Sequence, residues 1–310
     1  MKPYHQVAVF FAITQMIGIF SGIVLIQAAL VDETIREFSV VPPFMSTNQN
    51  SPVDALATSL LFIFYILFGA VMIVIISRYY KGMMFFRLLE LMVIASASAI
   101  VFFTIGIYLG LDFTIAFLVG GGAGFALAAL KFFVVEVKNT AAIISSAGVG
   151  ALFGFSLSTT FGVPFGFLST VGFILLLSIY DYIAVFKTKH MIEMARELST
   201  RQLSFAVTAK NIPARKPHEK REEYVERAMN EGERLDLGTG DLSVPAMISV
   251  SAFTLGPSGL LYSLAVAAGS TLSLFFLLQF VSRRRVFLPA LPPICLGGMV
   301  ALLLVKLAGL

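Results

Sequence analysis

The sequence predicts an all-α membrane protein with nine transmembrane helices, its N-terminus in the cytoplasm and its C-terminus outside. Its 310 residues are 58% hydrophobic and only 13% charged, whereas soluble domains carry about 25% charged residues. The mean hydropathy is correspondingly high, at +0.90. Apolar stretches of transmembrane length recur along the chain, and basic residues gather in alternate connections, as the positive-inside rule requires.

Nine segments are long and apolar enough to cross a bilayer. A hydrocarbon core about 30 Å thick needs about 20 apolar residues in a helix. On that measure the expected spans are residues 6–31, 54–77, 86–109, 112–130, 140–161, 164–186, 238–255, 259–281 and 286–308. The apolar run of the first, Val7 to Val31, is longer than the about 7–15 residues of a signal peptide core. We therefore take it as a membrane span.

The distribution of positive charge tests this count independently. Of the 22 Lys and Arg residues, all but two lie in segments that the nine spans place on the inner side: 1–5, 78–87, 131–139, 187–237 and 282–285. The two exceptions are Arg36 and Lys306. A wrong number of spans would place many of the basic residues on the outer side. The charges therefore support nine helices in the stated orientation.

The connections divide the chain into three regions. Residues 1–186 form a six-helix membrane region, 187–237 a cytoplasmic loop, and 238–310 a three-helix membrane region. Within the loop we expect an amphipathic helix from Lys187 to Leu198 on the membrane surface, and a strand at Phe205–Ala209. The other long connection, 32–53, is rich in Pro, Ser and Asn, so little regular structure is expected there.

Pairs of glycines four residues apart occur in several predicted spans. This spacing lets helix backbones approach closely in lipid. It is compatible with a dimer interface, but packing inside the nine-helix bundle is the favoured interpretation. The pairs are Gly18/Gly22, Gly106/Gly110, Gly120/Gly124 and Gly150/Gly154.

The composition also narrows the chemistry. The single cysteine, Cys295, excludes an intramolecular disulfide and a CxxC metal site. The three histidines, at 5, 190 and 218, are too scattered to form a zinc cluster by themselves. We expect no metal, no organic cofactor and no nucleic-acid partner; the lipid bilayer is the expected environment.

Carboxylates inside a membrane are costly, by about 2.5–3.5 kcal/mol each on insertion scales, and each therefore suggests a function. Most have a structural explanation. Asp54 and Asp112 begin helices, where negative charge is favourable, and Glu90 is expected to pair with Arg87 three residues earlier. Glu136 lies among lysines.

Asp181 and Asp241 have no such explanation. Asp181 lies six residues before Lys187, the first inner charge, and Asp241 begins the next span, seven residues after Arg234. At about 1.5 Å per residue, both lie on the order of 8–10 Å inside the cytoplasmic boundary. Because the two helices run in opposite directions, the carboxylates reach similar depths and can be partners.

Two adjacent carboxylates cannot both ionise easily, so they share one proton. The ionised group can then take a proton from water while the protonated group polarises a carbonyl. This is the chemistry of an aspartyl protease. An ion- or proton-coupled transporter, or a cation leak, would use the same pair, so the Asp residues alone do not decide between these functions.

The residues around the pair favour hydrolysis. Gly238 and Gly240 precede Asp241, and Pro245 follows it; proline has no N–H for the carbonyl of residue 241, which loosens the first turn. In the last span, Pro289-Ala290-Leu291-Pro292-Pro293 lies at a matching depth, and three prolines in five residues are expected to prevent regular helix. Exposed backbone is tolerated in a bilayer only where it is buried in protein or lines a water-filled cavity. A peptide-bond hydrolase requires such surroundings.

These three places resemble the YD, GxGD and PAL motifs of the presenilin and signal peptide peptidase family. Here they read Tyr180-Asp181, Gly238-Thr239-Gly240-Asp241 and Pro289-Ala290-Leu291. Their order, the nine-helix layout and the long inner loop also match, and the stretch Asp181–Met191 is similar to archaeal members. The family usually has Leu where this chain has Thr239, a difference that bears on the preferred cleavage site.

The resemblance implies an intramembrane aspartyl protease with Asp181 and Asp241 as its catalytic pair. It further implies that Tyr180, Gly238, Gly240 and the segment from Pro289 through Ala290 to Leu291 shape the active site and receive substrate. The expected substrates are transmembrane segments of other proteins. The expected location is a prokaryotic cell membrane, as a multi-pass protein, and the charge distribution matches the presenilin orientation. A catalytically inactive membrane scaffold remains the third alternative.

Two other protease motifs are weak. Gly256-Pro257-Ser258-Gly259 resembles the GxSG pattern of rhomboid serine proteases, but such an enzyme needs a membrane-embedded His base, and every His lies in an inner segment. We therefore expect a turn there. His218-Glu219 begins like HExxH but continues to Glu223 instead of His, which disfavours a metalloprotease.

Overall fold

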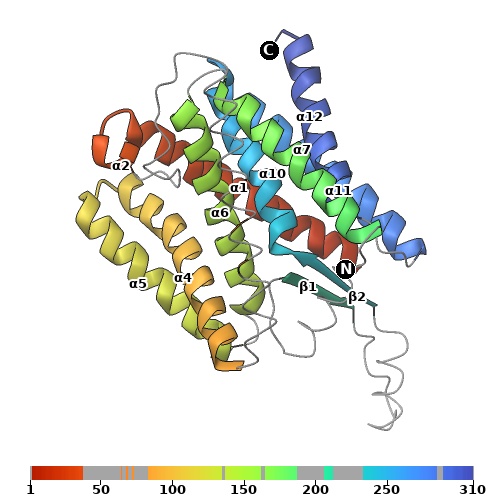
Figure 1. Ribbon diagram of the computed structural model, residues 1–310, viewed down its shortest axis with the longest axis horizontal. Helices are drawn as coiled ribbons and strands as arrows, with labels where there is room; N and C mark the ends of the chain where they lie inside the picture. Colours follow the sequence, from red (N-terminus) through yellow and green to blue (C-terminus); the bar gives the residue numbers. More distant parts are fainter. Residues whose placement is uncertain are drawn as a thin grey trace.

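A computed structural model of the chain describes residues 2–37, 83–134, 137–161, 165–186, 206–211, 233–284 and 289–309, together with Phe64, Phe68 and Met72. These parts form a helical bundle with one small β-hairpin at one end (Figure 1). The N-terminus lies beside the hairpin, whereas the C-terminus lies at the far end of the last helix (Figure 1).

Helices occupy the predicted spans wherever the structure describes them. Their bounds are α1 Pro3–Ala29, α2 Glu33–Glu37, α4 Met83–Tyr108, α5 Phe113–Phe133, α6 Val137–Phe161, α7 Phe165–Phe186, α10 Thr239–Ala252, the 3₁₀ helix η1 Phe253–Leu255, α11 Gly259–Arg284 and α12 Leu291–Leu307. Most of the predicted span 54–77 lies outside the described residues, but Phe64, Phe68 and Met72 are helical. The expected surface helix at 187–198 also lies outside them.

Among the described helices, five are long and apolar enough to cross a membrane: those beginning at Pro3, Arg87, Phe113, Val137 and Gly259. The apolar parts of α7 and α12, Gly166–Tyr182 and Leu291–Leu307, are shorter. Many large apolar side chains on the outer helices are exposed, as expected of surfaces that face lipid.

Helix α10 lies in the middle of the bundle, and glycines allow its neighbours to approach it. All its residues from Pro245 to Ala252 are buried. A Cβ built at Gly18 of α1 would lie 3.2 Å from Cβ of Ala246, and one at Gly150 of α6 would lie 2.7 Å from the carbonyl oxygen of Ser243. Substitution of Gly150 would therefore force the helices apart, whereas at Gly18 the neighbour would have to move by a few tenths of an ångström.

The remaining glycines of the four pairs, except Gly110, also lie at close contacts between helices. Gly22 and Gly154 face Val250 of α10, whereas Gly120 and Gly124 of α5 face the backbone of α4. Gly110 differs, since it ends α4 with a φ of 78°, a conformation that glycine adopts without strain. The pairs thus serve packing inside the bundle, as the sequence analysis favoured.

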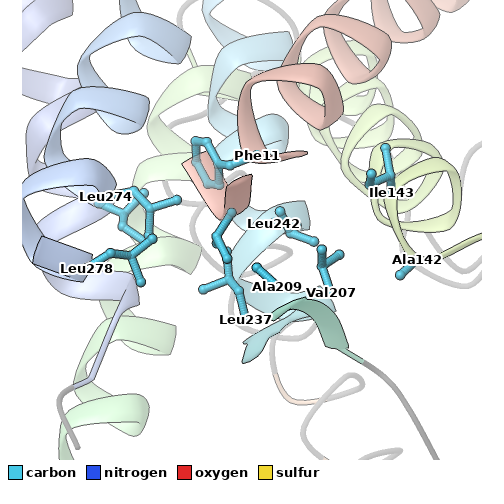
Figure 2. Packing of buried hydrophobic residues seen from close by; sticks show 11 residues of the cluster. Phe11, Ala142, Ile143, Val207, Ala209, Leu237, Leu242, Leu274 and Leu278 are labelled. Carbon is cyan, nitrogen blue, oxygen red and sulfur yellow. The ribbon is translucent and has the colours of Figure 1, made fainter. Parts of the chain in front are cut away.

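The predicted strand is present and has a partner. Strand β1, Ala206–Asn211, pairs antiparallel with β2, Glu233–Gly238, with Val207 opposite Leu237. The side chains of both residues join a buried apolar cluster with Phe11 of α1, Leu242 of α10 and Leu274 of α11 (Figure 2). Because β2 runs directly into α10, this cluster fixes the start of the helix that carries Asp241.

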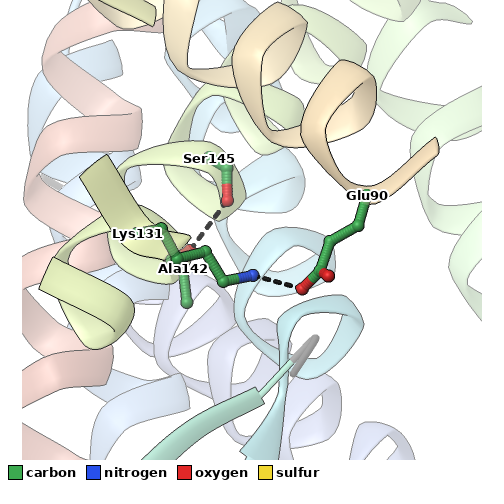
Figure 3. A network of polar contacts seen from close by, with 4 residues as sticks. All are labelled: Glu90, Lys131, Ala142 and Ser145. Atoms are coloured by element: carbon green, nitrogen blue, oxygen red, sulfur yellow. Dashed lines mark hydrogen bonds and ion pairs between the residues drawn. The ribbon is translucent and has the colours of Figure 1, made fainter. Parts of the chain in front are cut away.

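Glu90 does not pair with Arg87 as expected. It is 3% exposed and forms an ion pair with Lys131, whose side chain is 6% exposed (Figure 3). Figure 3 shows the two side chains meeting between α4 and α5, near Ser145 of α6. Arg87 is exposed, because it occupies a different face of α4. The partner of Glu90 thus comes from another helix.

A short helix, α2, forms at Glu33–Glu37 in the connection after α1, and Oδ1 of Asp32 accepts a hydrogen bond from the Thr34 N–H there (2.9 Å). The rest of the connection 32–53 lies outside the described residues. One further expectation needs correction. Pro292 and Pro293 do not prevent helix, since α12 begins at Leu291 and holds both in its first turn, whereas Pro289 precedes the helix. Proline fits there because the N–H groups of a first turn have no partners within the helix.

Three smaller expectations are confirmed. Asp112 caps α5, since its side chain accepts a hydrogen bond from the Thr114 N–H (3.1 Å). Gly256, Pro257 and Ser258 form the turn between η1 and α11. Pro245 lies inside α10.

Candidate active site

Asp181 lies on α7 and is buried against the start of α12. Only 4% of its surface is exposed, because it faces the bundle, whereas its neighbours Tyr180 and Tyr182 are 54% and 57% exposed. Its Oδ2 accepts a hydrogen bond from the backbone N–H of Leu291 (3.4 Å), and the N–H of Ala290 also interacts with the carboxyl group. N–H groups at the start of a helix have no partner within it. At the start of α12 they interact with the Asp181 carboxyl group instead.

Asp241 lies in the first turn of α10 and folds back towards the residue before that helix. The backbone N–H of Gly238 interacts with its carboxyl group. A Cβ built at Gly238 would come within 3.3 Å of Oδ2 of Asp241, so a side chain there would crowd the carboxylate. Space around Gly240 is open, with nothing within 4 Å of a built Cβ.

The two aspartates come from helices that pack against each other, and both of these helices also contact α12. The charge of Asp181 acts on the Asp241 carboxyl, and Cys295 of α12 lies within the field of both. Residues far apart in the sequence thus meet where α7, α10 and α12 come together. Two close carboxylates can hold one proton between them, which provides an acid and a base in one place.

Pro289, Leu291 and Tyr180, which were also predicted to shape the site, differ in burial. Pro289 is buried just before α12, and Leu291 is 9% exposed beside Asp181. Tyr180 lies on the outer side of α7, and within the described parts of the chain no hydrogen bond joins its side chain to either aspartate. Its role in shaping the site stays a prediction.

Two cavities reach sequence neighbours of the aspartates, although neither is lined by Asp181 or Asp241. One, of about 290 Å³, lies between α4, α6, α7 and α10 and reaches Thr239 and Gly240 beside Asp241. The other, of about 330 Å³, lies between α7, α10 and α12 and reaches Tyr182, Pro292 and Cys295. Both are mainly apolar, so they suit side chains or lipid tails better than ions.

The sequence did not indicate two features of this site. One is the pair of backbone N–H groups at Ala290 and Leu291, since a backbone donor has no residue signature. The other is β2, which precedes Asp241 in the polar segment Glu233–Gly238. Within the described ranges, no group of three or more His, Cys, Asp or Glu side chains could hold a metal ion.

Comparison with known proteins identifies the family. The model of the family described as signal-peptide peptidase, presenilin aspartyl protease matches residues 23–309. The chain belongs to this family. The matched range includes all three motifs, at 180–181, 238–241 and 289–291.

Solved structures agree on the fold. Two structures of a presenilin family intramembrane aspartate protease, in space groups C222 and P2, superpose with TM-scores of 0.63 and 0.60. They are 22% and 21% identical to the chain, and each alignment covers 99% of it, with 100% and 99% of the other chain. At this identity the similarity shows a shared fold. Among curated proteins, no sequence matches.

Proposed function

We propose that this protein is an intramembrane aspartyl endopeptidase that hydrolyses peptide bonds within transmembrane segments. The observation that carries the proposal is the meeting of Asp181 and Asp241 at the start of α12, inside a bundle of apolar helices. Membership of the aspartyl protease family supports the same conclusion. Aspartyl proteases need no metal or organic cofactor.

The reaction uses the two carboxyl groups as a unit. The ionised aspartate removes a proton from a water molecule as its oxygen attacks the scissile carbonyl carbon, while the protonated aspartate donates its proton to the carbonyl oxygen. A tetrahedral diol results. Its collapse breaks the C–N bond as the amide nitrogen receives a proton, which releases a new carboxyl and a new amino end and returns one proton to the pair.

A helical substrate must first be unwound, because its amides are hidden by their own hydrogen bonds. An extended segment could be held by pairing with the β-hairpin. At Thr208 of β1, the backbone N–H and C=O are both bonded by the side-chain amide of Asn139, at 3.0 and 2.9 Å. We therefore propose the edge of β2, which leads into Gly238, as the one that receives substrate, with Leu291 and the apolar cavities beside it.

The proposed topology has nine transmembrane helices, with the N-terminus cytoplasmic and the C-terminus outside. The termini lie at opposite ends of the bundle (Figure 1), which supports an odd number of spans, and the positive charges support the orientation. The two membrane regions are then 1–186 and 238–310, and the cytoplasmic loop 187–237 joins them. In the prokaryotic cell membrane proposed as its location, substrates would have outward-facing N-termini.

Cleavage of a single-span reporter by the purified protein tests this function. Mass spectrometry should find cuts inside the reporter's membrane span, absent when Asp181→Asn or Asp241→Asn replaces the wild type. The second candidate, an ion- or proton-coupled transporter or cation leak, rests on the same two aspartates. Reconstituted vesicles distinguish them, because a transporter predicts flux that needs both aspartates without any proteolysis. Folded wild-type protein that shows such flux and no cleavage would contradict the protease.

A further inference from the structure

Gln15 is a buried amide in the apolar middle of α1, and it contacts the helix that carries Asp241. Its side chain is 1% exposed. Its Nε2 donates a hydrogen bond to the carbonyl oxygen of Leu242 (3.2 Å), and its Oε1 accepts one from the Ser249 hydroxyl (3.3 Å). Leu242 directly follows Asp241 in the sequence.

Chemistry fixes the direction of this amide. A backbone carbonyl only accepts, so the NH₂ group of Gln15 must face Leu242, and its oxygen is left for the Ser249 hydroxyl, which can donate. Ser249 is also 3.0 Å from the carbonyl oxygen of Pro245, and its single proton is shared between the two acceptors. Gln15 therefore binds α10 at two points, seven residues apart.

The backbone hydrogen bond that Pro245 removes from α10 lies between these two points. Pro245 has no N–H, so the carbonyl of Asp241 cannot receive the usual helix hydrogen bond from residue 245. The turn that carries Asp241 is thus attached to the rest of α10 by fewer backbone bonds than an ordinary first turn. The two contacts of Gln15, at Leu242 and Ser249, span this weakened turn from the neighbouring helix.

We infer that Gln15 is a positioning residue, which holds the turn bearing Asp241 in register with Asp181. The inference rests on the proposed proteolysis for its consequence in catalysis, although its structural part does not. Gln15 acts through the backbone of Leu242 and the hydroxyl of Ser249. A displacement of about 1 Å in a reacting group can lower a rate about 100-fold. The loss of the two hydrogen bonds from Gln15 to Leu242 and Ser249, called the brace below, should therefore lower kcat more than it changes substrate binding.

The chain offers matched controls in the same helix. Among the described residues, the buried Thr14 has one side-chain hydrogen bond, to the carbonyl oxygen of Phe10 in the same helix (2.9 Å). Ser21 accepts a hydrogen bond from Thr104 of α4 (3.1 Å), so it links α1 to a helix that carries neither aspartate. Thr14→Val and Ser21→Ala therefore remove buried polar groups from α1 without affecting its bonds to α10.

The test compares Gln15→Met, which keeps the length of the side chain, with these controls and with Ser249→Ala. We expect Gln15→Met to lower kcat about tenfold or more while KM changes less than about twofold. Ser249→Ala, which keeps the bond to Leu242, should lose less. Both controls should retain the wild-type kcat. Equal losses in Gln15→Met and the controls, or a loss matched by a similar rise in KM, would overturn the inference.

A second measurement does not depend on proteolysis. Hydrogen exchange of residues 239–249, followed by mass spectrometry, should be at least about fivefold faster in Gln15→Met than in Thr14→Val, because two hydrogen bonds to α10 are lost and each is worth about 1 kcal/mol. Unchanged exchange in a folded variant would contradict the brace even if the wild type cleaved no substrate. Faster exchange in a protein without proteolytic activity would instead uphold the brace and count against the proposed function.

Discussion

The backbone N–H of Leu291 donates a hydrogen bond to Oδ2 of Asp181, across 110 positions of the sequence (3.4 Å). The start of α12 thereby fixes the position of a carboxylate of α7. The PAL segment thus contacts Asp181 through its backbone. The first prediction therefore concerns the backbone N–H groups at the start of α12.

Removal of one backbone donor should impair catalysis. Ala290 has φ −86°, close to the range of proline, so Ala290→Pro removes its N–H with little change in conformation. We expect kcat to fall about tenfold, since hydrogen bonds to charged groups are worth about 1.5–3 kcal/mol. Ala290→Gly, which keeps the N–H, is the control. Equal kcat values for the two variants in reporter cleavage would contradict this role.

The two glycines before Asp241 should respond differently to substitution. In Gly238→Ala the new methyl group crowds Oδ2 of Asp241 at 3.3 Å, so we expect mainly a lower kcat. In Gly240→Ala the methyl group enters open space beside the apolar cavity, where it would meet substrate, so we expect mainly a higher KM. Steady-state kinetics on one reporter separates these effects, and the opposite assignment would count against the geometry.

Close packing on α10 should be sensitive to a single methyl group. A Cβ at Gly154 would lie 2.7 Å from Cβ of Val250 and 2.9 Å from the Met247 carbonyl oxygen. Gly154→Ala should therefore lower the thermal unfolding midpoint in detergent, at a cost of about 1–3 kcal/mol. Gly121→Ala on α5 is the control, because nothing lies within 4 Å of its built Cβ. If both variants unfold like wild type, α10 is packed less tightly than described.

The buried ion pair between α4 and α5 should matter for stability. Glu90→Gln leaves Lys131 without this carboxylate, and the loss of one member of a buried pair costs about 3–5 kcal/mol. Replacement of both residues by leucine should recover much of the loss, since apolar substitutes of similar volume are often neutral. Arg87→Gln, at an exposed position, serves as the control. A thermal midpoint unchanged by Glu90→Gln would contradict the pair.

The shared proton predicts a bell-shaped dependence of kcat on pH. One proton must be present in the pair, so activity should fall in alkali when both carboxylates are ionised and in acid when both are protonated. Reporter cleavage across a pH series at constant ionic strength tests this. A rate that continues to rise through alkaline pH would exclude the shared-proton mechanism.

Local sequence patterns predicted the helices well. The expected span 112–130 became Phe113–Phe133, and 140–161 became Val137–Phe161, because length, hydropathy and caps such as Asp112 act within a single helix. The three motifs were likewise readable, since Asp, Gly and Pro have distinct chemistry. That the two carboxylates act together as a catalytic pair stays a prediction.

Features that depend on distant partners were not predictable in the same way. Strand β2 is polar and forms through its pairing with β1, so its own residues give little strand signal. The pairing of Glu90 with Lys131, rather than with Arg87, depends on how α4 packs against α5. The donors at Ala290 and Leu291 are backbone groups, whose availability follows from where α12 begins.

The central claim is that Asp181 and Asp241 act as one catalytic unit, and a double-mutant comparison tests it most directly. Reporter cleavage should be measured for Asp181→Asn, Asp241→Asn and the double variant, with thermal unfolding as the control for folding. Because groups that act as a unit are strongly non-additive, we expect each single variant to fall to the same background as the double variant while remaining folded. A single variant that keeps near-normal cleavage would contradict the claim.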